Sequence, residues 1–175
     1  NKVYISAREL CQFVLRGGDI DPHKMAGNKN GTSVISHKLW EMKPELKRGF
    51  YIDVNSDDVD ICVYGLNNCL TEVDGKLTVS LTEIVDYSLD YIENGLLEIV
   101  TNEAMCLGYM ACQLNNLNEI DCVVAFEKEG DDQERVFKET LSLEGLKGSF
   151  DMLIALFTPY ARLIKDKGTT VTAQL

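Results

Sequence analysis

The chain has 175 residues, of which 45% are hydrophobic and 26% are charged, a composition typical of a globular protein that buries a core without disulfides. No apolar run approaches the ~18 residues that a membrane span requires, and no secretory leader pattern opens the chain. We therefore expect a cytoplasmic protein without a membrane partner, folded as one domain over residues 1–175.

The net charge of −11 is unevenly distributed. Through Arg48 the chain has 9 basic and 5 acidic residues, a balance of +4, and from Gly49 onward it has 8 basic and 23 acidic residues, a balance of −15. Because clustered Lys and Arg attract a phosphate backbone, we expect any nucleic-acid contact in the basic first third. The candidate contact residues are Arg8, Arg16 and Lys38.

The six cysteines form no C-x-x-C pair, and each has apolar neighbours. This pattern favours reduced cysteines packed as small hydrophobic residues, with no bound cofactor. An iron–sulfur or zinc site is the alternative.

The predicted elements begin with a strand at Val3–Ile5. A helix follows, because Ser6 and Glu9 have the spacing of a capping box, and Gly17-Gly18 ends it. The segment Asp19–Asn30 has the composition of a loop.

A second helix is predicted at Thr32–Met42, with Pro44 as its stop. Strands are predicted at Phe50–Val54 and Val59–Tyr64. They are followed by a hairpin of Cys69–Val73 and Leu77–Ile84, whose corner is Asp74-Gly75. Asp-Gly between alternating apolar runs favours a type I′ turn, which needs positive φ at both residues.

The second half of the chain alternates between helices and strands. We predict a loop at Asp86–Gly95, a helix at Asn102–Leu114, strands at Ile120–Phe126 and Arg135–Leu141, and a helix at Leu143–Lys165. The order predicts an α+β fold, a mixed α/β core with a central mixed sheet flanked by helices.

Several stretches resemble one known family. The opening Val3–Ile20, the helix motif Val34–Leu39, the strand and turn Val63–Leu70, the strand Thr82–Val85 and the late helix from Glu103 to Gln113 are similar to the RecB-like branch of the PD-(D/E)XK nuclease superfamily. The resemblance implies a restriction-endonuclease-like core and a bacterial origin. It also implies DNA as a ligand and a helicase as a partner.

The residue types at the family's catalytic positions are changed. The resemblance assigns the metal-binding His to Ser36 and the first Asp to Asn68, and the Asp-Glu-x-Lys set falls on Thr82, Glu83 and Val85. Only Glu83 keeps its type. Since Mg²⁺ is held by carboxylates and water, one remaining carboxylate provides a weak site at best.

The sequence therefore favours a catalytically inactive nuclease-like domain with a nucleic-acid-binding or assembly role. One alternative is an active Mg²⁺-dependent DNA nuclease that uses Asp58, Asp60 or Glu83. The other alternative is a protein–protein interaction module.

Overall fold

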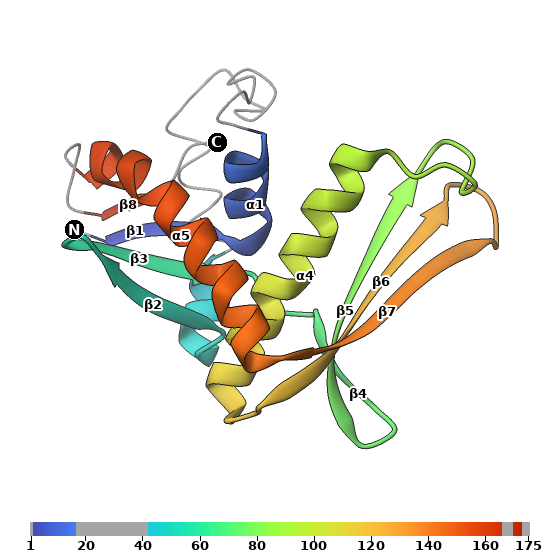
Figure 1. The fold of residues 1–175 in the computed structure, drawn as a ribbon, viewed down its shortest axis with the longest axis horizontal. Coiled ribbons are helices and arrows are strands. Elements are labelled where there is room, and N and C mark those ends of the chain that lie inside the picture. The colour runs from blue at the N-terminus through green and yellow to red at the C-terminus, as the bar shows by residue number, and fades with distance from the viewer. Residues whose placement is uncertain (1, 17–41, 166–169, 173–175) are drawn as a thin grey trace. The chain divides into compact units, whose positions relative to one another are not determined.

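The computed structural model describes residues 2–16, 42–165 and 170–172 (Figure 1). Its helices are α1 (Ala7–Leu15), α4 (Asn94–Asn115) and α5 (Leu143–Lys165), and residues 42–48 are also helical. Its strands are β1 (Lys2–Ser6), β2 (Tyr51–Ser56), β3 (Val59–Tyr64), β4 (Leu70–Val73), β5 (Lys76–Val85), β6 (Glu119–Lys128), β7 (Glu134–Ser142) and β8 (Thr170–Thr172). The predicted α+β class, with mixed sheets and flanking helices, is confirmed.

The chain divides into two compact units, each with its own sheet. Unit 1 comprises Asn1–Asn67 and Asp151–Leu175, with strand order β2-β3-β1-β8, and unit 2 comprises Asn68–Phe150, with order β4-β5-β6-β7. The strands therefore form two four-stranded sheets, where we expected one central sheet. The division follows β3, where Gly65 has φ +115° and the chain turns before β4 pairs with β5. The expectation of a single domain stays a prediction.

In unit 1, α1 begins as its sequence predicts. The Ser6 hydroxyl accepts a hydrogen bond from the Glu9 N–H at 3.1 Å and donates one to Glu9 Oε1 at 2.9 Å. This arrangement satisfies an N–H group that the first helical turn leaves without a backbone partner. The helix then buries Leu10 and Cys11, and β1, which pairs in parallel with β3, buries Val3.

The second half of α5 belongs to unit 1 and packs on α1. The Phe13 ring meets the Phe157 ring edge to face at a centroid distance of 5.6 Å, and it meets the Tyr160 ring at 4.4 Å. Thr158 is buried, and its hydroxyl contacts the Ser56 hydroxyl at 2.9 Å. These contacts tie α5 to both α1 and the end of β2.

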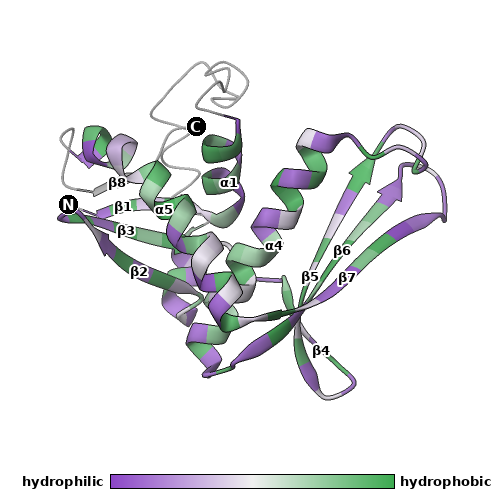
Figure 2. Ribbon diagram, in the orientation of Figure 1, coloured by the Kyte–Doolittle hydropathy of each residue, from purple (hydrophilic) through white to green (hydrophobic). Residues whose placement is uncertain are grey.

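In unit 2, α4 packs against β5 and β6, and Figure 2 shows hydrophobic residues along much of this helix. Gly108 allows the close approach, since a Cβ added there would lie 3.0 Å from Cys122 Sγ and 3.3 Å from the Ile120 side chain. At the β4–β5 corner, Asp74 has φ +51° and Gly75 has φ +79°, so the predicted turn with two positive φ angles is confirmed.

Three local predictions were wrong. The helix α4 begins at Asn94 rather than Asn102, because Ile99 and Val100 extend its buried face toward the N-terminus. Pro44 does not end a helix, since the helical residues run from Met42 through Pro44 to Arg48. The short strand β8 was not predicted. The expected Asp19–Asn30 loop, the Gly17-Gly18 stop and most of the Thr32–Met42 helix lie outside the described residues.

Candidate functional site

The end of β5 carries three of the five positions that resemble a nuclease site. Side chains alternate along a strand, so Glu83 and Val85 share one face and Thr82 lies on the other. Glu83 is half-buried, Val85 is 5% exposed and Thr82 is exposed. The fourth position, Asn68, is close to this strand, because the next residue, Cys69, accepts a backbone hydrogen bond from Ser80 at 2.8 Å.

Unit 2 therefore holds four of these positions on one β-hairpin and the turn before it: Asn68, Thr82, Glu83 and Val85. Ser36, the fifth, lies outside the described residues. Asn68 is exposed with φ +66°, a left-handed conformation in which Asn and Asp are several-fold enriched. The backbone thus favours Asn or Asp at position 68, and this chain has the uncharged one.

Among the four positions Asn68, Thr82, Glu83 and Val85, only Glu83 is a carboxylate. Asn68 offers an amide and Thr82 a hydroxyl on the opposite face from Glu83. Val85 lies in the core, where a charged group would require desolvation. Within the described residues, no group of three or more His, Cys, Asp and Glu side chains is placed to hold a metal ion.

One cation near this strand was not identified from the sequence. Lys128 pairs with Val85 across the parallel β5–β6 ladder, and Phe126 pairs with Glu83. The Lys128 side chain is half-buried and lies on the face shared by Glu83 and Val85. Only the strand pairing reveals this neighbour, because residues 85 and 128 are far apart in the sequence.

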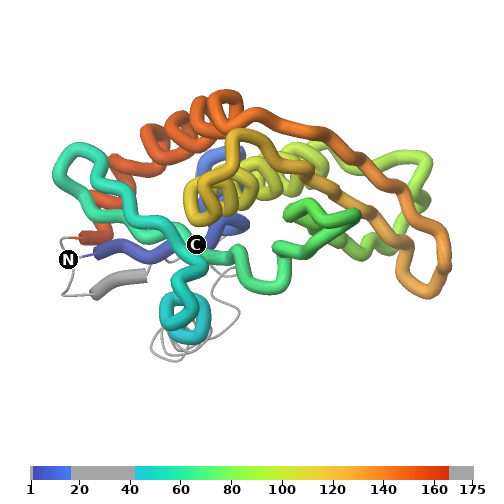
Figure 3. The backbone as a smooth tube through the Cα atoms, turned by 90° about the horizontal axis from the view of Figure 1, so that it is seen from below, coloured from blue at the N-terminus to red at the C-terminus, as the bar shows by residue number. Residues whose placement is uncertain are grey.

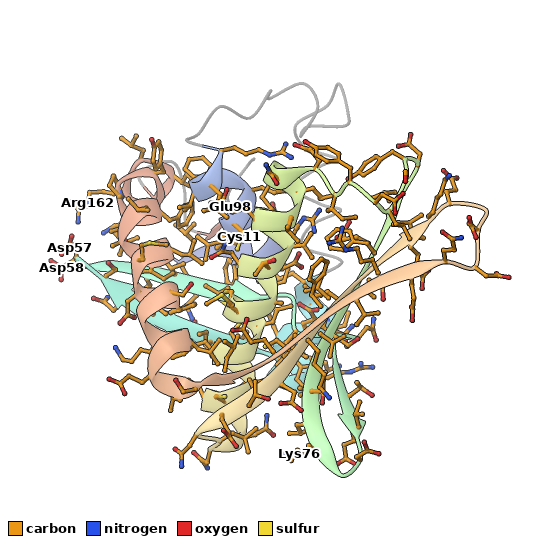
Figure 4. The ribbon with its side chains drawn as sticks, turned by 45° about the vertical axis from the view of Figure 1, so that its right-hand side comes forward. Cys11, Asp57, Asp58, Lys76, Glu98 and Arg162 are labelled. Carbon is orange, nitrogen blue, oxygen red and sulfur yellow. The ribbon has the colours of Figure 1, made fainter. Side chains whose placement is uncertain are left out.

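The other acidic candidates lie in unit 1, in the β2–β3 hairpin. The Asp60 carboxylate accepts a hydrogen bond from Asn55 Nδ2 at 2.9 Å. The backbone carbonyl of Asp58 accepts one from Lys165 Nζ at 3.2 Å, and that of Asp57 accepts one from Arg162. Figure 4 shows Arg162 beside Asp57 and Asp58 at this corner. The hairpin corner is therefore held by the end of α5.

The charge of the two units differs strongly. Unit 2 has 5 basic and 17 acidic residues, a balance of −12, whereas unit 1 has 12 basic and 11 acidic residues, a balance of +1. The negative charge of the chain thus resides in the unit that carries Asn68, Thr82, Glu83 and Val85. A potential of this sign repels a phosphate backbone from that site.

The predicted nucleic-acid residues lie in unit 1. Arg8 is half-buried on α1, Arg16 is exposed at the C-terminal end of α1, and Lys38 lies outside the described residues. The helical residues 42–48 add three exposed cations that sequence reasoning missed as binding candidates: Lys43, Lys47 and Arg48. Arg48 also donates to Asn67 Oδ1 at 3.4 Å. Their close spacing in the sequence was the available signal.

A buried carboxylate fixes the turn after β3. Glu45 is 8% exposed, and it accepts hydrogen bonds from the N–H of Gly65 at 2.9 Å and from the N–H of Asn67 at 3.2 Å. These bonds join the 42–48 helix to the segment that leads to Asn68. Nothing in the sequence near Glu45 distinguishes it from an exposed helical glutamate.

Two buried cysteines have thiols that stay protonated at neutral pH. Burial raises the pKa of the Cys62 and Cys122 thiols to about 12, so both are neutral near pH 7. All six cysteines are reduced, and Cys69 is the one that is half-buried rather than buried.

Comparisons with known proteins identify no family for this chain. No protein-family model matches the chain, and no curated protein matches it. A solved structure described as "Crystal structure of SSO0001" has a TM-score of 0.39 and 12% sequence identity, covering 87% of this chain and 76% of that one. A likeness this distant carries no argument. Within residues 2–16, 42–165 and 170–172, no helix combines the length and hydropathy that crossing a bilayer requires.

Proposed function

We propose that this chain is a catalytically inactive module of the PD-(D/E)XK nuclease type that acts by binding in the cytoplasm of a bacterium. The observation that carries the proposal is the burial of Val85, which is 5% exposed at the position where the resemblance expects the catalytic lysine. A valine in the core contributes packing energy and no charge. With Asn68 in place of a carboxylate, Glu83 alone is left to hold a divalent cation, too few ligands to lower the pKa of a metal-bound water.

Nucleic-acid binding, with DNA as the ligand that the resemblance implies, is the role that we assign to unit 1. Its support is the three exposed cations of the 42–48 helix, Lys43, Lys47 and Arg48, with Arg16 exposed at the end of α1, in a unit whose charge balance is +1 rather than −12. Each contact with a phosphate releases a counterion, so the affinity should fall as salt rises. A helicase is the kind of partner that the resemblance implies, and assembly with a protein is the second role that we propose.

A cleavage assay tests the loss of activity. End-labelled single-stranded DNA is incubated with the protein and Mg²⁺ or Mn²⁺, and the wild type is compared with Glu83→Gln. We expect equal amounts of product from both, at the level of a buffer control. Cleavage by the wild type that Glu83→Gln abolishes would instead establish the alternative, an active nuclease. If the wild type does cleave, Lys128→Ala would test whether Lys128 supplies the positive charge that the family's lysine would provide at position 85.

The binding role has a separate test. Fluorescence anisotropy of labelled single-stranded DNA should show an affinity that falls between ~50 mM and ~200 mM salt, and Arg16→Glu should weaken it. Lys76→Glu is the matched control, because Lys76 is also exposed but belongs to the acidic unit 2. Equal effects of the two reversals would remove the assignment to unit 1. If the wild type shows no DNA binding at all, the assembly role is the one that stands.

A further inference from the structure

The strand β7 forms one edge of the unit 2 sheet. It pairs with β6 antiparallel from Glu134 to Ser142, and Figures 1 and 3 show the two strands running side by side. Among the described residues, no strand pairs with the other side of β7. Alternate N–H and C=O groups along that side are consequently available to a further strand.

The side chains of β7 are accessible along its whole length. Eight of its nine residues are exposed, and Leu141 is half-buried. Two large apolar residues are among the exposed ones, Val136 at 49% and Phe137 at 37%. A long, exposed edge of this kind is a template for strand addition.

The charge of β7 differs from that of the rest of unit 2. The strand has two basic and two acidic residues, whereas the remainder of the unit has 3 basic and 15 acidic residues. Two copies of the unit therefore repel each other over most of their surface, and β7 is a neutral stretch along which they are able to approach.

We propose that β7 is a self-association surface that pairs antiparallel with β7 of a second copy, around a two-fold axis at Val136. The pairing places Glu134 opposite Lys138 of the second copy, twice by symmetry, and Val136 opposite its own counterpart. The unit 2 sheets of the two copies then form one continuous sheet across the axis. The inference uses neither the Glu83 region nor the basic residues of unit 1, so it stands independently of the proposed function.

The register follows from two constraints. Outward-facing backbone groups occur at every second residue, so an even-numbered residue pairs only with an even-numbered one, or an odd with an odd. The excluded registers include the one that sets Arg135 against Lys138 and Glu134 against Glu139, which would place like charges opposite each other.

A register centred on Phe137 also pairs opposite charges, but Arg135 and Phe137 already make contacts within their own copy. The Arg135 guanidinium lies 5.1 Å from the centre of the Phe137 ring and donates to the Leu89 carbonyl at 3.3 Å. Phe137 meets the Phe126 ring edge to face at 6.1 Å. The Val136 register leaves these contacts intact and pairs Glu134, which makes no ion pair within the described residues. Its partner Lys138 already has one ion pair inside its own copy, a long one of 3.9 Å between Lys138 Nζ and Asp121 Oδ2.

Charge reversal tests the register in the full chain. Sedimentation velocity over a range of concentrations should show a reversible dimer of the wild type. Glu134→Lys and Lys138→Glu should each raise the dissociation constant about tenfold, because each turns two attractive pairs into repulsive ones. The double variant, Glu134→Lys with Lys138→Glu, should restore the wild-type value. Lys76→Glu is the matched control and should leave the dimer unchanged.

Cysteine cross-linking supplies a second readout. Val136→Cys should form a disulfide-linked dimer on mild oxidation, whereas Glu139→Cys should not, since residue 139 faces Gln133 of the second copy in this register. Circular dichroism establishes that each variant is folded. A wild type that stays monomeric at every concentration would overturn the proposal. A dimer that neither single reversal weakens, or that cross-links equally through positions 136 and 139, would also overturn it.

Discussion

The carboxylate of Glu45 provides a sharp test of how the turn before Asn68 is held. Its two oxygens accept the N–H groups of Gly65, at 2.9 Å, and of Asn67, at 3.2 Å, and the residue is 8% exposed. Gly65 has φ +115°, a conformation that L side chains rarely adopt. The turn is therefore fixed from two sides, by the glycine backbone and by the carboxylate.

The expected loss of stability follows from the two hydrogen bonds that Glu45 accepts. A hydrogen bond to a charged acceptor stabilises a protein by roughly 1.5–3 kcal/mol net. Glu45→Gln keeps one acceptor oxygen and turns its amide toward the other N–H, so we expect a loss of about 2 kcal/mol in the free energy of unfolding. Glu45→Ala removes both acceptors, and since water reaches part of the half-buried turn, we expect about 3–4 kcal/mol rather than the full sum.

Urea denaturation followed by far-ultraviolet circular dichroism measures these differences. The neighbouring Lys47→Ala is the control, because Lys47 is exposed and its truncation should change stability by less than about 0.5 kcal/mol. A Glu45→Ala loss below about 1 kcal/mol would refute the reasoning, as would a Glu45→Gln variant as stable as Lys47→Ala.

Three further predictions concern packing, backbone conformation and pH. Val85→Ala should cost about 2 kcal/mol, whereas Ile84→Ala, at a side chain that is 66% exposed, should cost less than about 0.5 kcal/mol; equal losses in urea would contradict the assignment of Val85 to the core. Gly75→Ala, at φ +79°, should lower the melting temperature, and Gly148→Ala, inside α5 with open space around it, should raise it by removing helical glycine. Because burial raises the pKa of Cys62 from 9.0 to about 12, the folded state holds this proton more tightly than the unfolded state does. The stability that the protonated Cys62 thiol contributes is therefore fully present below pH 9 and is lost as the pH rises from 9 to 12. The free energy of unfolding of Cys62→Ala should fall less steeply with pH over that range than that of the wild type. Equal slopes for the two proteins would contradict the assignment of this pH dependence to Cys62.

The sequence predicted the elements best where local chemistry decides the backbone. Ser6 and Glu9 fix the start of α1, and Asp74-Gly75 fixes the β4–β5 corner. The prediction of α5 at Leu143–Lys165 agrees with the structure at both ends. In each case residues close together in the chain determine the conformation.

Features that depend on distant segments were not predictable in the same way. The division of the strands between two sheets depends on pairings such as β1 with β3 and β5 with β6, which alternation of polar and apolar residues does not specify. The buried role of Glu45 and the placement of Lys128 beside Val85 have the same origin. Periodicity indicates which face of an element is buried, and it does not indicate which other element covers that face.

The candidate site also has features that the sequence predicted and features that depend on distant segments. The positions Asn68, Thr82, Glu83 and Val85 do lie on one hairpin and its preceding turn. Their environments came only from the structure: the positive φ of Asn68, the 5% exposure of Val85 and the opposite faces of Thr82 and Glu83. These environments supply the physical reason to expect a site with too few charges for metal-dependent hydrolysis.

Divalent-ion binding tests that expectation most directly. In a titration of the full chain with Mn²⁺, followed by the electron paramagnetic resonance of the free ion, we predict no site tighter than about 1 mM and no difference between the wild type and Glu83→Gln. A stoichiometric Mn²⁺ site of micromolar affinity that Glu83→Gln removes would contradict the account.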